Sequence, residues 1–207
     1  MTHPLAGILA EAARGRPPPA DGTVVVTGPP PGRASAVVAF TAHHVIAAAV
    51  GDGAARARLP EGDLGAPMGA EFLMWLGGRI GATPGTLDVV LAATGTGDGA
   101  ALPPIDAAPH PRVGRAVRYR DDVAVFGSDD GIVVLGRGLA GRREVAVDGA
   151  PEHRGRGAGR RLAAAARALT PAGEPLFAQV APGNAASVRA FLAAGYRPIG
   201  AEVLFLP

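Results

Sequence analysis

The sequence lacks two of the side chains on which much enzyme chemistry depends. It has no cysteine among its 207 residues, which excludes disulfides, thiolate nucleophiles and cysteine-ligated zinc. It also has no lysine, because all 20 basic residues are arginine, and this excludes a Walker-type phosphate lysine and a Schiff base. Serine occurs only at positions 35, 128 and 187, never within Gly-x-Ser-x-Gly, and His-Glu-x-x-His is absent. These absences leave direct transfer of a group from a bound cofactor as the favoured kind of catalysis.

An excess of charge of one sign is also missing. The formal net charge is only +2, although the sequence pI is about 9.9. The two values agree because arginine keeps its proton to very high pH and few other groups titrate at mid and high pH. The high pI is thus no argument for binding nucleic acid, and we expect no nucleic-acid partner.

Long apolar runs suited to a membrane are missing too. The first apolar run is short and is interrupted by Glu11 and Arg14, unlike a signal peptide. The one uncharged stretch near membrane length, residues 34–51, is mostly alanine, valine and threonine, with His43 and His44 at its middle. We therefore expect a cytoplasmic protein with no membrane partner. The adjacent histidines would face opposite sides of a strand and could not chelate one metal, so we expect them to be structural or on the surface.

What is present suffices for a folded core. Hydrophobic residues make up 48% of the chain, and its length suits one large domain or two small ones. Periodicity and turn signals predict helices in residues 4–14, 54–59, 68–80, 111–122, 160–169 and 185–194. They predict strands in residues 24–26, 35–41, 45–50, 87–91, 123–126, 131–135, 143–147 and 176–180, with one or two more in 196–206. This alternation predicts an α/β (α+β) chain.

One helix carries a row of arginines. Arg112, Arg115 and Arg118 fall three residues apart, so they share a face of the predicted helix 111–122. Such a face is either solvated or in contact with an acidic acceptor or partner, and the sequence leaves both open.

An earlier helix carries a row of large apolar side chains. Met68, Phe72 and Trp75 recur near helical spacing in the predicted helix 68–80. They could line an acceptor pocket, but spacing of this kind favours packing in a core.

A glycine-rich stretch at residues 154–159 has the sequence Arg-Gly-Arg-Gly-Ala-Gly. It lies between the predicted strand 143–147 and the predicted helix 160–169. A strand, a glycine turn and a helix in that order leave free backbone N–H groups at a helix N-terminus, which is a ready site for phosphate. The glycines also remove side chains that would keep a diphosphate from the backbone. The alternative is a turn with a structural role only.

Together with the elements that follow, this stretch resembles the GNAT N-acetyltransferase superfamily. One signature of that family is Gln or Arg, two residues, Gly, one residue, and Gly or Ala. A second is Asn, two residues and a small residue, followed further on by Gly and an aromatic residue. The residues that meet the two signatures are Arg154, Gly157, Gly159, Asn184, Ser187, Gly195 and Tyr196. The resemblance covers roughly residues 110–207 and leaves residues 1–100 without a motif.

The resemblance implies a division of the chain. Residues 106–207 are expected to form an acetyl-CoA-binding domain, with a GNAT-like mixed central sheet flanked by helices. Residues 1–105 are expected to form an N-terminal α/β lobe of unknown role, either a degenerate half-copy of the same fold or a separate cap.

The resemblance also implies acetyl-CoA or another acyl-CoA as co-substrate, and no metal. The diphosphate is expected on the glycine loop, and the pantetheine arm between two parallel strands, residues 144–147 and 176–180. N–H groups of the first strand are expected to face the thioester carbonyl. The residues implied in cofactor binding are Val145, Ala146, Val147, Arg154, Gly155, Arg156, Gly157, Ala158, Gly159, Arg160, Asn184 and Ser187.

Acyl transfer to an amine also needs a base, because an alkylamine is mostly protonated near neutral pH. Glu144, on the predicted catalytic strand, is the first candidate, and Asp148 is the second. Where the family often has a tyrosine as general acid, this chain has Phe191, which cannot protonate a thiolate. Tyr196 is expected to pack in the core. Either the thiolate leaves unassisted, another group serves, or the domain binds CoA without efficient turnover.

Three functions remain open at this stage. The leading one is an acyltransferase that moves an acetyl or other acyl group from acyl-CoA to a small-molecule or protein amine by direct attack. The second is a non-catalytic acyl-CoA-binding regulatory module. The third is another phosphate-binding α/β protein, such as a nucleotide binder, against which the missing lysine and the Gly-x-Gly-x-Gly spacing both count. A homodimer is possible, but the sequence does not determine the oligomeric state.

Overall fold

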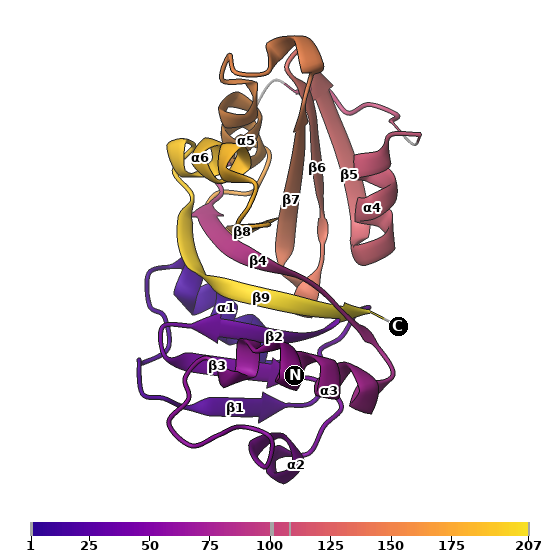
Figure 1. The fold of residues 1–207 in the computed structure, drawn as a ribbon. Coiled ribbons are helices and arrows are strands. Elements are labelled where there is room, and N and C mark those ends of the chain that lie inside the picture. The colour runs from indigo at the N-terminus through magenta and orange to yellow at the C-terminus, as the bar shows by residue number, and fades with distance from the viewer. Residues whose placement is uncertain (1, 100–101, 108, 207) are drawn as a thin grey trace.

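The structure is a computed structural model that describes residues 2–99, 102–107 and 109–206. Its strands form one mixed sheet in the order β1-β3-β2-β9-β4-β8-β7-β6-β5 (Figure 1). The bounds are Val24–Thr27 (β1), Ser35–Phe40 (β2), His43–Ala47 (β3), Thr83–Thr94 (β4), Asp121–Ser128 (β5), Gly131–Arg137 (β6), Arg143–Gly149 (β7), Pro175–Val180 (β8) and Arg197–Leu206 (β9). A large mixed sheet flanked by helices confirms the predicted α/β class.

Six α-helices and three short 3₁₀ turns are described. The α-helices are Pro4–Ala13 (α1), Asp52–Arg56 (α2), Ala70–Ile80 (α3), Pro111–Tyr119 (α4), Ala158–Ala168 (α5) and Ala185–Ala193 (α6). The 3₁₀ turns are Ala66–Met68 (η1), Leu139–Gly141 (η2) and Pro151–His153 (η3). In the described part of the chain, no helix has both the length and the apolarity to cross a bilayer.

Capping residues set the two ends of α6. The side chain of Asn184 accepts a hydrogen bond from the N–H of Ser187 at 3.1 Å, which satisfies one free donor of the first turn. Gly195, just past the last turn, has φ of +85°, a conformation that glycine adopts without strain. Helix α6 is thus held in register with β8 before it and β9 after it.

Several predicted boundaries differ from the structure. The helix predicted for residues 111–122 ends at Tyr119, because Arg120 takes an extended conformation and β5 starts at once. The strand predicted for residues 87–91 runs from Thr83 to Thr94, and its polar outer part pairs with β9. Pairing across the sheet extends this strand beyond the apolar run that marked it in the sequence.

Strands from both halves of the chain share the sheet. β2 pairs antiparallel with β9, and β4 lies between β9 and β8, antiparallel to both. β4, from the predicted N-terminal lobe, is therefore in direct contact with strands of the predicted acetyl-CoA-binding domain. The division at residue 105 stays a prediction, as does the origin of the lobe as a half-copy.

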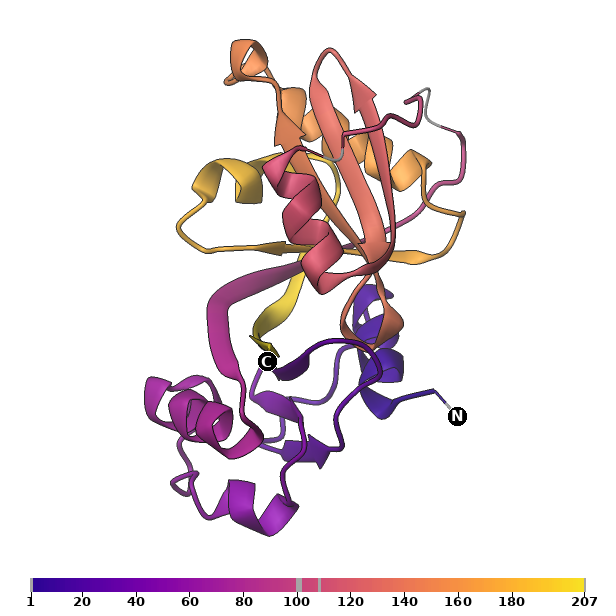
Figure 2. The same ribbon diagram turned by 90° about the vertical axis from the view of Figure 1, so that its right-hand side faces the viewer.

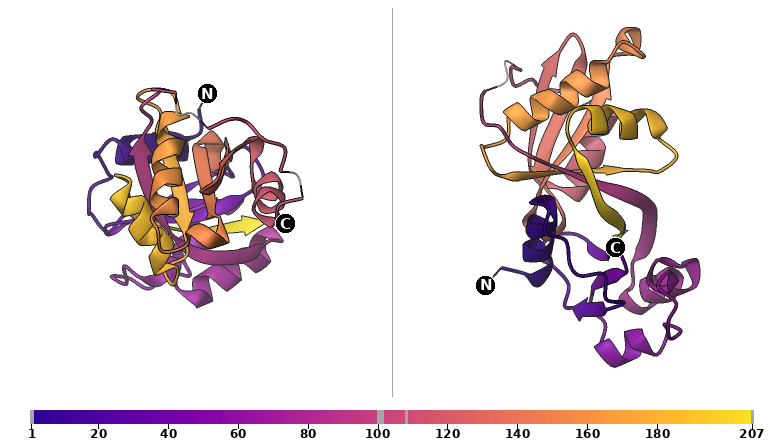
Figure 3. Two further views of the ribbon diagram at one scale, coloured as in Figure 1. Left: turned by 90° about the horizontal axis from the view of Figure 1, so that it is seen from above. Right: turned by 90° about the vertical axis from the view of Figure 1, so that its left-hand side faces the viewer.

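Alternate residues of β6 face two different helical layers. Val133 and Leu135 pack under α5 and α6, whereas Val134 packs against α4. Helices α5 and α6 therefore cover one face of β6 to β8, and α4 covers the other (Figures 2 and 3). The neighbouring strand β7 lies between the same two layers.

The N-terminal strands are covered on both faces as well. Helix α1 packs on one face through Leu5 and Leu9, and α3 packs on the other through Phe72. Met68 and Trp75 pack against the same cluster as Phe72, which confirms core packing for this row of side chains. Each fully buried side chain of this size contributes about 1.5–3 kcal/mol to stability.

The adjacent histidines lie in β3 and are both buried. Nδ1 of His43 is 3.0 Å from Oδ1 of Asp21, and burial, followed by the proximity of His43, lowers the pKa of His44. The pair has a structural place in the strand, in line with the sequence prediction.

Candidate functional site

Strands β7 and β8 run parallel and then separate. Their pairing begins at Arg143 with Leu176 and ends at Val145 with Ala178. Beyond Val145, β7 continues to Gly149 paired only with β6. The parallel pair confirms the prediction, and a gap between the strands opens where the pantetheine arm is expected.

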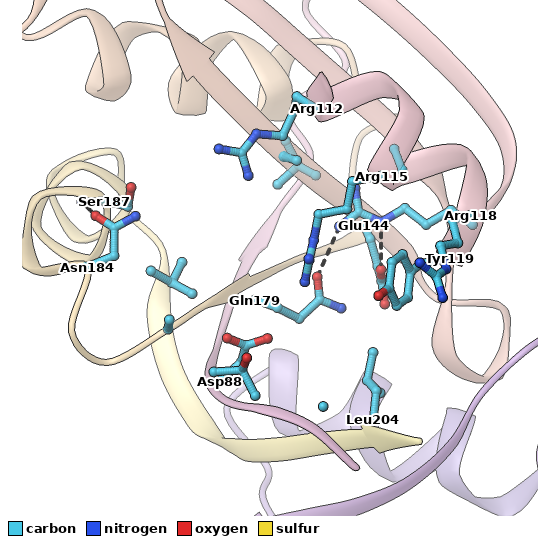
Figure 4. Close-up of a pocket in the computed structure, with 18 of the residues that line it drawn as sticks. Asp88, Arg112, Arg115, Arg118, Tyr119, Glu144, Gln179, Asn184, Ser187 and Leu204 are labelled. Atoms are coloured by element: carbon cyan, nitrogen blue, oxygen red, sulfur yellow. Dashed lines mark hydrogen bonds and ion pairs between the residues drawn. The ribbon is translucent and has the colours of Figure 1, made fainter. Parts of the chain in front are cut away.

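A cavity of about 660 Å³ lies at this gap (Figure 4). Helix α4 lines it on one face of the sheet and α6 on the other, with β4, β7, β8 and β9 between them. Because α4 and α6 cover opposite faces, the cavity passes through the sheet where β7 and β8 separate. The predicted cofactor-binding residues that line it are Val145, Ala146, Val147, Asn184 and Ser187.

The glycine loop follows β7 and lies outside the lining of the cavity. Gly155 and Gly157 have φ of +73° and +83°, which glycine adopts without strain. Of the seven N–H groups of residues 154–160, those of Gly155, Gly157, Ala158, Gly159 and Arg160 have no acceptor among the described residues. The N–H groups of Arg154 and Arg156 donate to carbonyls of the preceding turn, so these two are engaged. The other five stand at the N-terminus of α5, where an anion is favoured.

Asp130, in the turn between β5 and β6, anchors this loop. Its carboxylate accepts hydrogen bonds from Nε and Nη2 of Arg161 at 2.6 and 2.5 Å, and it lies 3.1 Å from Nδ1 of His153. Hydrogen bonds from Arg161, outweighing partial burial and helped by His153, lower the pKa of Asp130 to about 2. Arg161 also donates to the carbonyl of Arg156 at 2.8 Å. The loop conformation is therefore fixed by charged contacts on its outer side.

The aromatic side chains of the α6 region have structural roles. Phe191 is 3% exposed and meets Tyr196 edge-on, with ring centroids 4.9 Å apart. The hydroxyl of Tyr196 donates to the carbonyl of Ala163 at 3.2 Å, and burial raises its pKa. A hydroxyl in this state is a poor proton donor. Tyr196 is buried and packs in the core, as predicted.

Glu144 is buried in a chain of four charged side chains. It accepts a hydrogen bond from Nε of Arg142 and another from Nε of Arg120, each at 2.8 Å. Arg142 in turn donates to both carboxylate oxygens of Glu202, at 2.8 and 2.5 Å. Gly138 makes room for the network, because a Cβ at that position would overlap the carboxylate of Glu144. Two carboxylates and two guanidinium groups leave the network neutral overall.

This network limits what Glu144 can do chemically. Burial acts to raise its pKa, but Arg142 and Arg120 outweigh burial and lower it. Glu144 lines the cavity, yet a carboxylate held in this way accepts a proton poorly, which weakens the case for it as the base; that role stays a prediction. Asp148, the second candidate, is not among the residues that line the cavity, and its side chain is 38% exposed.

Asp88 is a half-buried carboxylate of β4 that the sequence analysis did not single out. It lines the cavity near Gln179 (Figure 4), and no described residue makes a hydrogen bond or an ion pair with it. Burial, with smaller contributions from Glu202 and Glu144, raises its pKa to about 6 against the opposing charge of Arg115. A carboxyl group that titrates near neutral pH is suited to accept a proton during a reaction.

Two hydrogen-bond donors in the cavity wall have no partner. Nη2 of Arg120 donates to Oε1 of Gln179 at 3.1 Å, which leaves Nη1 of Arg120 and Nε2 of Gln179 without an acceptor in the described part of the molecule. The Arg120 side chain is only 10% exposed. Because an unsatisfied buried donor costs about 1–3 kcal/mol, these groups are suited to receive an oxygen of a ligand.

Sequence reasoning missed Asp88, Arg120 and Gln179. A weak signal was present, because Asp88 and Gln179 are single polar residues within otherwise apolar strand segments. The local sequence does not indicate that β4 pairs with β8, however, and that pairing is what brings the two side chains to one cavity.

Comparison with known proteins bears on residues 145–205, which match the family model "FR47-like protein". None of the curated proteins matches the chain significantly. A GCN5-related N-acetyltransferase from Kribbella flavida is 19% identical over 65% of this chain and 63% of its own length, with a TM-score of 0.40. A structure from Novosphingobium aromaticivorans, described as a GNAT-family acetyltransferase, is 20% identical over 61% of this chain and 67% of its own, with a TM-score of 0.39.

The FR47-like match covers β7 from Val145, the glycine loop, α5, β8, α6 and nearly all of β9. These are the elements that carry both sequence signatures, so the match confirms the GNAT resemblance for the C-terminal part of the chain. Residues 1–144 lie outside it. Asp88 and α4, which form much of the cavity wall, therefore have no counterpart within the matched segment.

Proposed function

We propose that this chain transfers an acetyl or other acyl group from acyl-CoA to an amine by direct attack of the amine nitrogen. The observation that carries the proposal is the cavity at the β7–β8 gap, with the free amides of the glycine loop beyond β7 and the carboxylate of Asp88 in its wall. The resemblance of residues 145–205 to the FR47-like and GNAT families supports the same chemistry.

The residues of the chain fit the two ends of an acyl-CoA molecule. Five free N–H groups at the start of α5 suit a diphosphate, and no described carboxylate pairs with Arg154, Arg156 or Arg160. The gap beyond Val145 suits an extended arm. Acyl-CoA, when bound, supplies the acyl group as a thioester. The proposal uses no metal, and no cluster of three or more potential metal ligands occurs in the described ranges.

Asp88 is the proposed base. In the transfer a carbon–nitrogen bond forms, the carbon–sulfur bond breaks, Asp88 takes the proton that the amine loses, and the sulfur leaves as a thiolate. An amine with a pKa of about 10.4 is neutral in only about one molecule in 10³ near pH 7.4, so a base in the cavity lowers the barrier. The unpartnered N–H groups of Arg120 and Gln179 can donate to an oxygen on which negative charge develops.

Release of free thiol from acetyl-CoA, measured with a broad panel of amines, tests the proposal. We expect turnover with at least one class of amine, and a kcat/KM about 100-fold lower in Asp88→Asn. The matched change Glu61→Gln alters an exposed carboxylate that does not line the cavity, and it should leave the rate unchanged. Turnover that is equal in Asp88→Asn and the parent protein would remove Asp88 from the mechanism.

A non-catalytic acyl-CoA-binding module is the second candidate. The observation in its favour is Phe191, which is buried beside the cavity at the position where the family often has a tyrosine acid. Tyr196 does not replace that acid, since its hydroxyl is engaged with Ala163. Tight CoA binding without thiol release for any amine in the panel would favour this candidate over the acyltransferase.

A further inference from the structure

The wall of the cavity formed by α4 and the residue that follows it is rich in arginine. The arginines that line it are Arg112, Arg115, Arg118 and Arg120. Arg120 pairs with Glu144 at 2.8 Å, and Arg112 lies 3.9 Å from Asp148. The guanidinium groups of Arg115 and Arg118 make no hydrogen bond or ion pair with any residue in the described ranges. The sequence left this row open as a solvated face or an acceptor contact. In the structure it includes two guanidinium groups that line a cavity and have no ion-pair partner in the described ranges.

Tyr119 holds both of these arginines at the wall. The Cζ atoms of Arg115 and Arg118 lie 5.0 and 5.8 Å from the centroid of its ring. Contact with an aromatic face orients a guanidinium group without cancelling its charge. In Figure 4, Arg115 extends from α4 into the cavity toward Gln179 and Asp88.

Two further donors belong to residues that line the same cavity. Nη1 of Arg120 and Nε2 of Gln179 are buried and have no acceptor among the residues described. Arg120 is neutralised by Glu144, but this N–H group still requires an oxygen partner. Against these donors the cavity offers one carboxylate without an ion pair, Asp88. The wall is thus suited to a ligand with an anionic group and one basic nitrogen.

We propose that the acceptor is an amine that also carries an anionic group, with an α-amino acid as the simplest case. Arg115 binds the anionic group, and Arg118 adds positive charge from the other side of the Tyr119 ring (Figure 4). The amine lies beside Asp88. This inference rests on the proposed acyl transfer and specifies its acceptor. Polyamines and lysine-rich peptides are disfavoured, because their extra positive charges meet unpaired guanidinium groups.

Initial rates of thiol release with matched amines test the inference. The probes are L-amino acids, their carboxamides, 2-aminoethyl phosphate and spermidine. We expect the carboxylate or phosphate amines to be preferred, and Arg115→Gln to raise the KM for the preferred one by about tenfold or more, with a much smaller effect on kcat. The KM for the matching carboxamide should change by less than about twofold in the same variant.

Three further variants keep the test specific. Arg115→Lys retains the charge and should restore part of the affinity, and Arg118→Gln should act in the same direction as Arg115→Gln. Arg79→Gln removes an equal charge from the exposed end of α3, outside the cavity lining, and should leave both KM values unchanged. The anionic acceptor would be overturned if carboxamides or spermidine were used as efficiently as amino acids and Arg115→Gln lowered all rates alike. That result would leave the proposed acyl transfer in place.

Calorimetric titration of the CoA-bound protein with each amino acid separates this inference from the proposed function. Amino-acid binding that Arg115→Gln weakens about tenfold or more, without thiol release from any amine, would support the anion site and overturn acyl transfer. Thiol release from neutral amines only, with no amino acid bound, would overturn the anion site alone. The anion site would also be overturned if no anionic amine were bound and none were used as an acceptor.

Discussion

The two ends of the candidate site are built in different ways. At the glycine loop the free donors are the backbone N–H groups of Gly155 and of residues 157–160, which are nearly consecutive and lie at one helix terminus. In the cavity the polar groups are side chains from four elements that lie far apart in the sequence. These are Asp88 of β4, Arg115 of α4, Glu144 of β7 and Gln179 of β8.

This difference explains why the glycine loop could be recognised in the sequence and the cavity residues could not. A backbone site needs only a short segment with the right conformations, and glycines at fixed spacing mark it. A side-chain site is assembled by strand pairing, so its members appear in the sequence as isolated polar residues. Substitutions in the loop should therefore act through its backbone conformation and the charge near its N–H groups. Substitutions in the cavity should act through ion pairs and pKa values.

Glu144→Ala, at the cavity end of the site, should have the largest effect. It removes the partner of Arg120 and one of the two partners of Arg142, both largely buried. Leaving buried charge uncompensated should lower the free energy of unfolding by about 3–5 kcal/mol. Urea denaturation measures this, with Glu61→Ala at an exposed position as control, expected within about 0.5 kcal/mol of the parent protein. A loss below about 1 kcal/mol in Glu144→Ala would contradict the network described here.

The pH dependence of Asp88 should produce the next largest effect. Its pKa of about 6 is raised by burial, Glu202 and Glu144, and is opposed by Arg115 and Arg142. We expect kcat/KM to rise with pH through about 6 and then to level off, and Asp88→Asn to lack this rise. The measurement is the rate of thiol release from about pH 5 to pH 8. A rise of the same size in Asp88→Asn would assign it to another group.

Stability should depend on Asp88 with the opposite sign. Because the folded pKa of about 6 lies above the ordinary value of 3.8, the folded protein binds more protons than the unfolded chain between these values. The free energy of unfolding therefore decreases, through this group, as the pH rises from about 3.8 to about 6. Asp88→Asn should gain stability relative to the parent protein near pH 7, with the difference vanishing near pH 4. Thermal unfolding at both pH values checks this, and a difference independent of pH would contradict it.

A smaller effect should distinguish the loop from an ordinary turn. Gly157 and Gly173 have φ of +83° and +81°, so glutamate at either position carries the same backbone strain, about 1–2 kcal/mol. Only Gly157→Glu adds a carboxylate beside the free N–H groups of α5, and it should weaken CoA binding by about tenfold or more. Calorimetric titration with CoA compares the two variants. Equal affinities would show that the diphosphate binds elsewhere.

The smallest effect should come from Tyr196→Phe. The change removes the hydrogen bond to Ala163 and should cost about 1 kcal/mol of stability. Thiol release should be unchanged, since this hydroxyl is not an acid for the thiolate. A large drop in rate with normal stability would restore Tyr196 as the missing acid.

Much of the C-terminal fold could be predicted from local signals. Asn184 and Gly195 mark the ends of α6, and Ser128 and Gly131 mark the hairpin of β5 and β6. Lengths were less predictable, because the outer part of β4 is polar and is a strand only through pairing with β9. The place of Glu144 was predicted as a strand residue, but its two arginine partners were not, since Arg120 and Arg142 reach it from outside the motif.

Short-range chemistry was sufficient to predict a phosphate site, because residues 155–160 supply the turn and most of its free N–H donors. It could not predict the proposed base or the side chains proposed to contact an acceptor, because these groups meet only when β4 lies between β8 and β9 and α4 covers the opposite face from α6. The physical reason is that backbone donors are positioned by neighbouring dihedral angles. Side-chain charges acquire their pKa values and partners from residues brought close by the packing of the whole sheet.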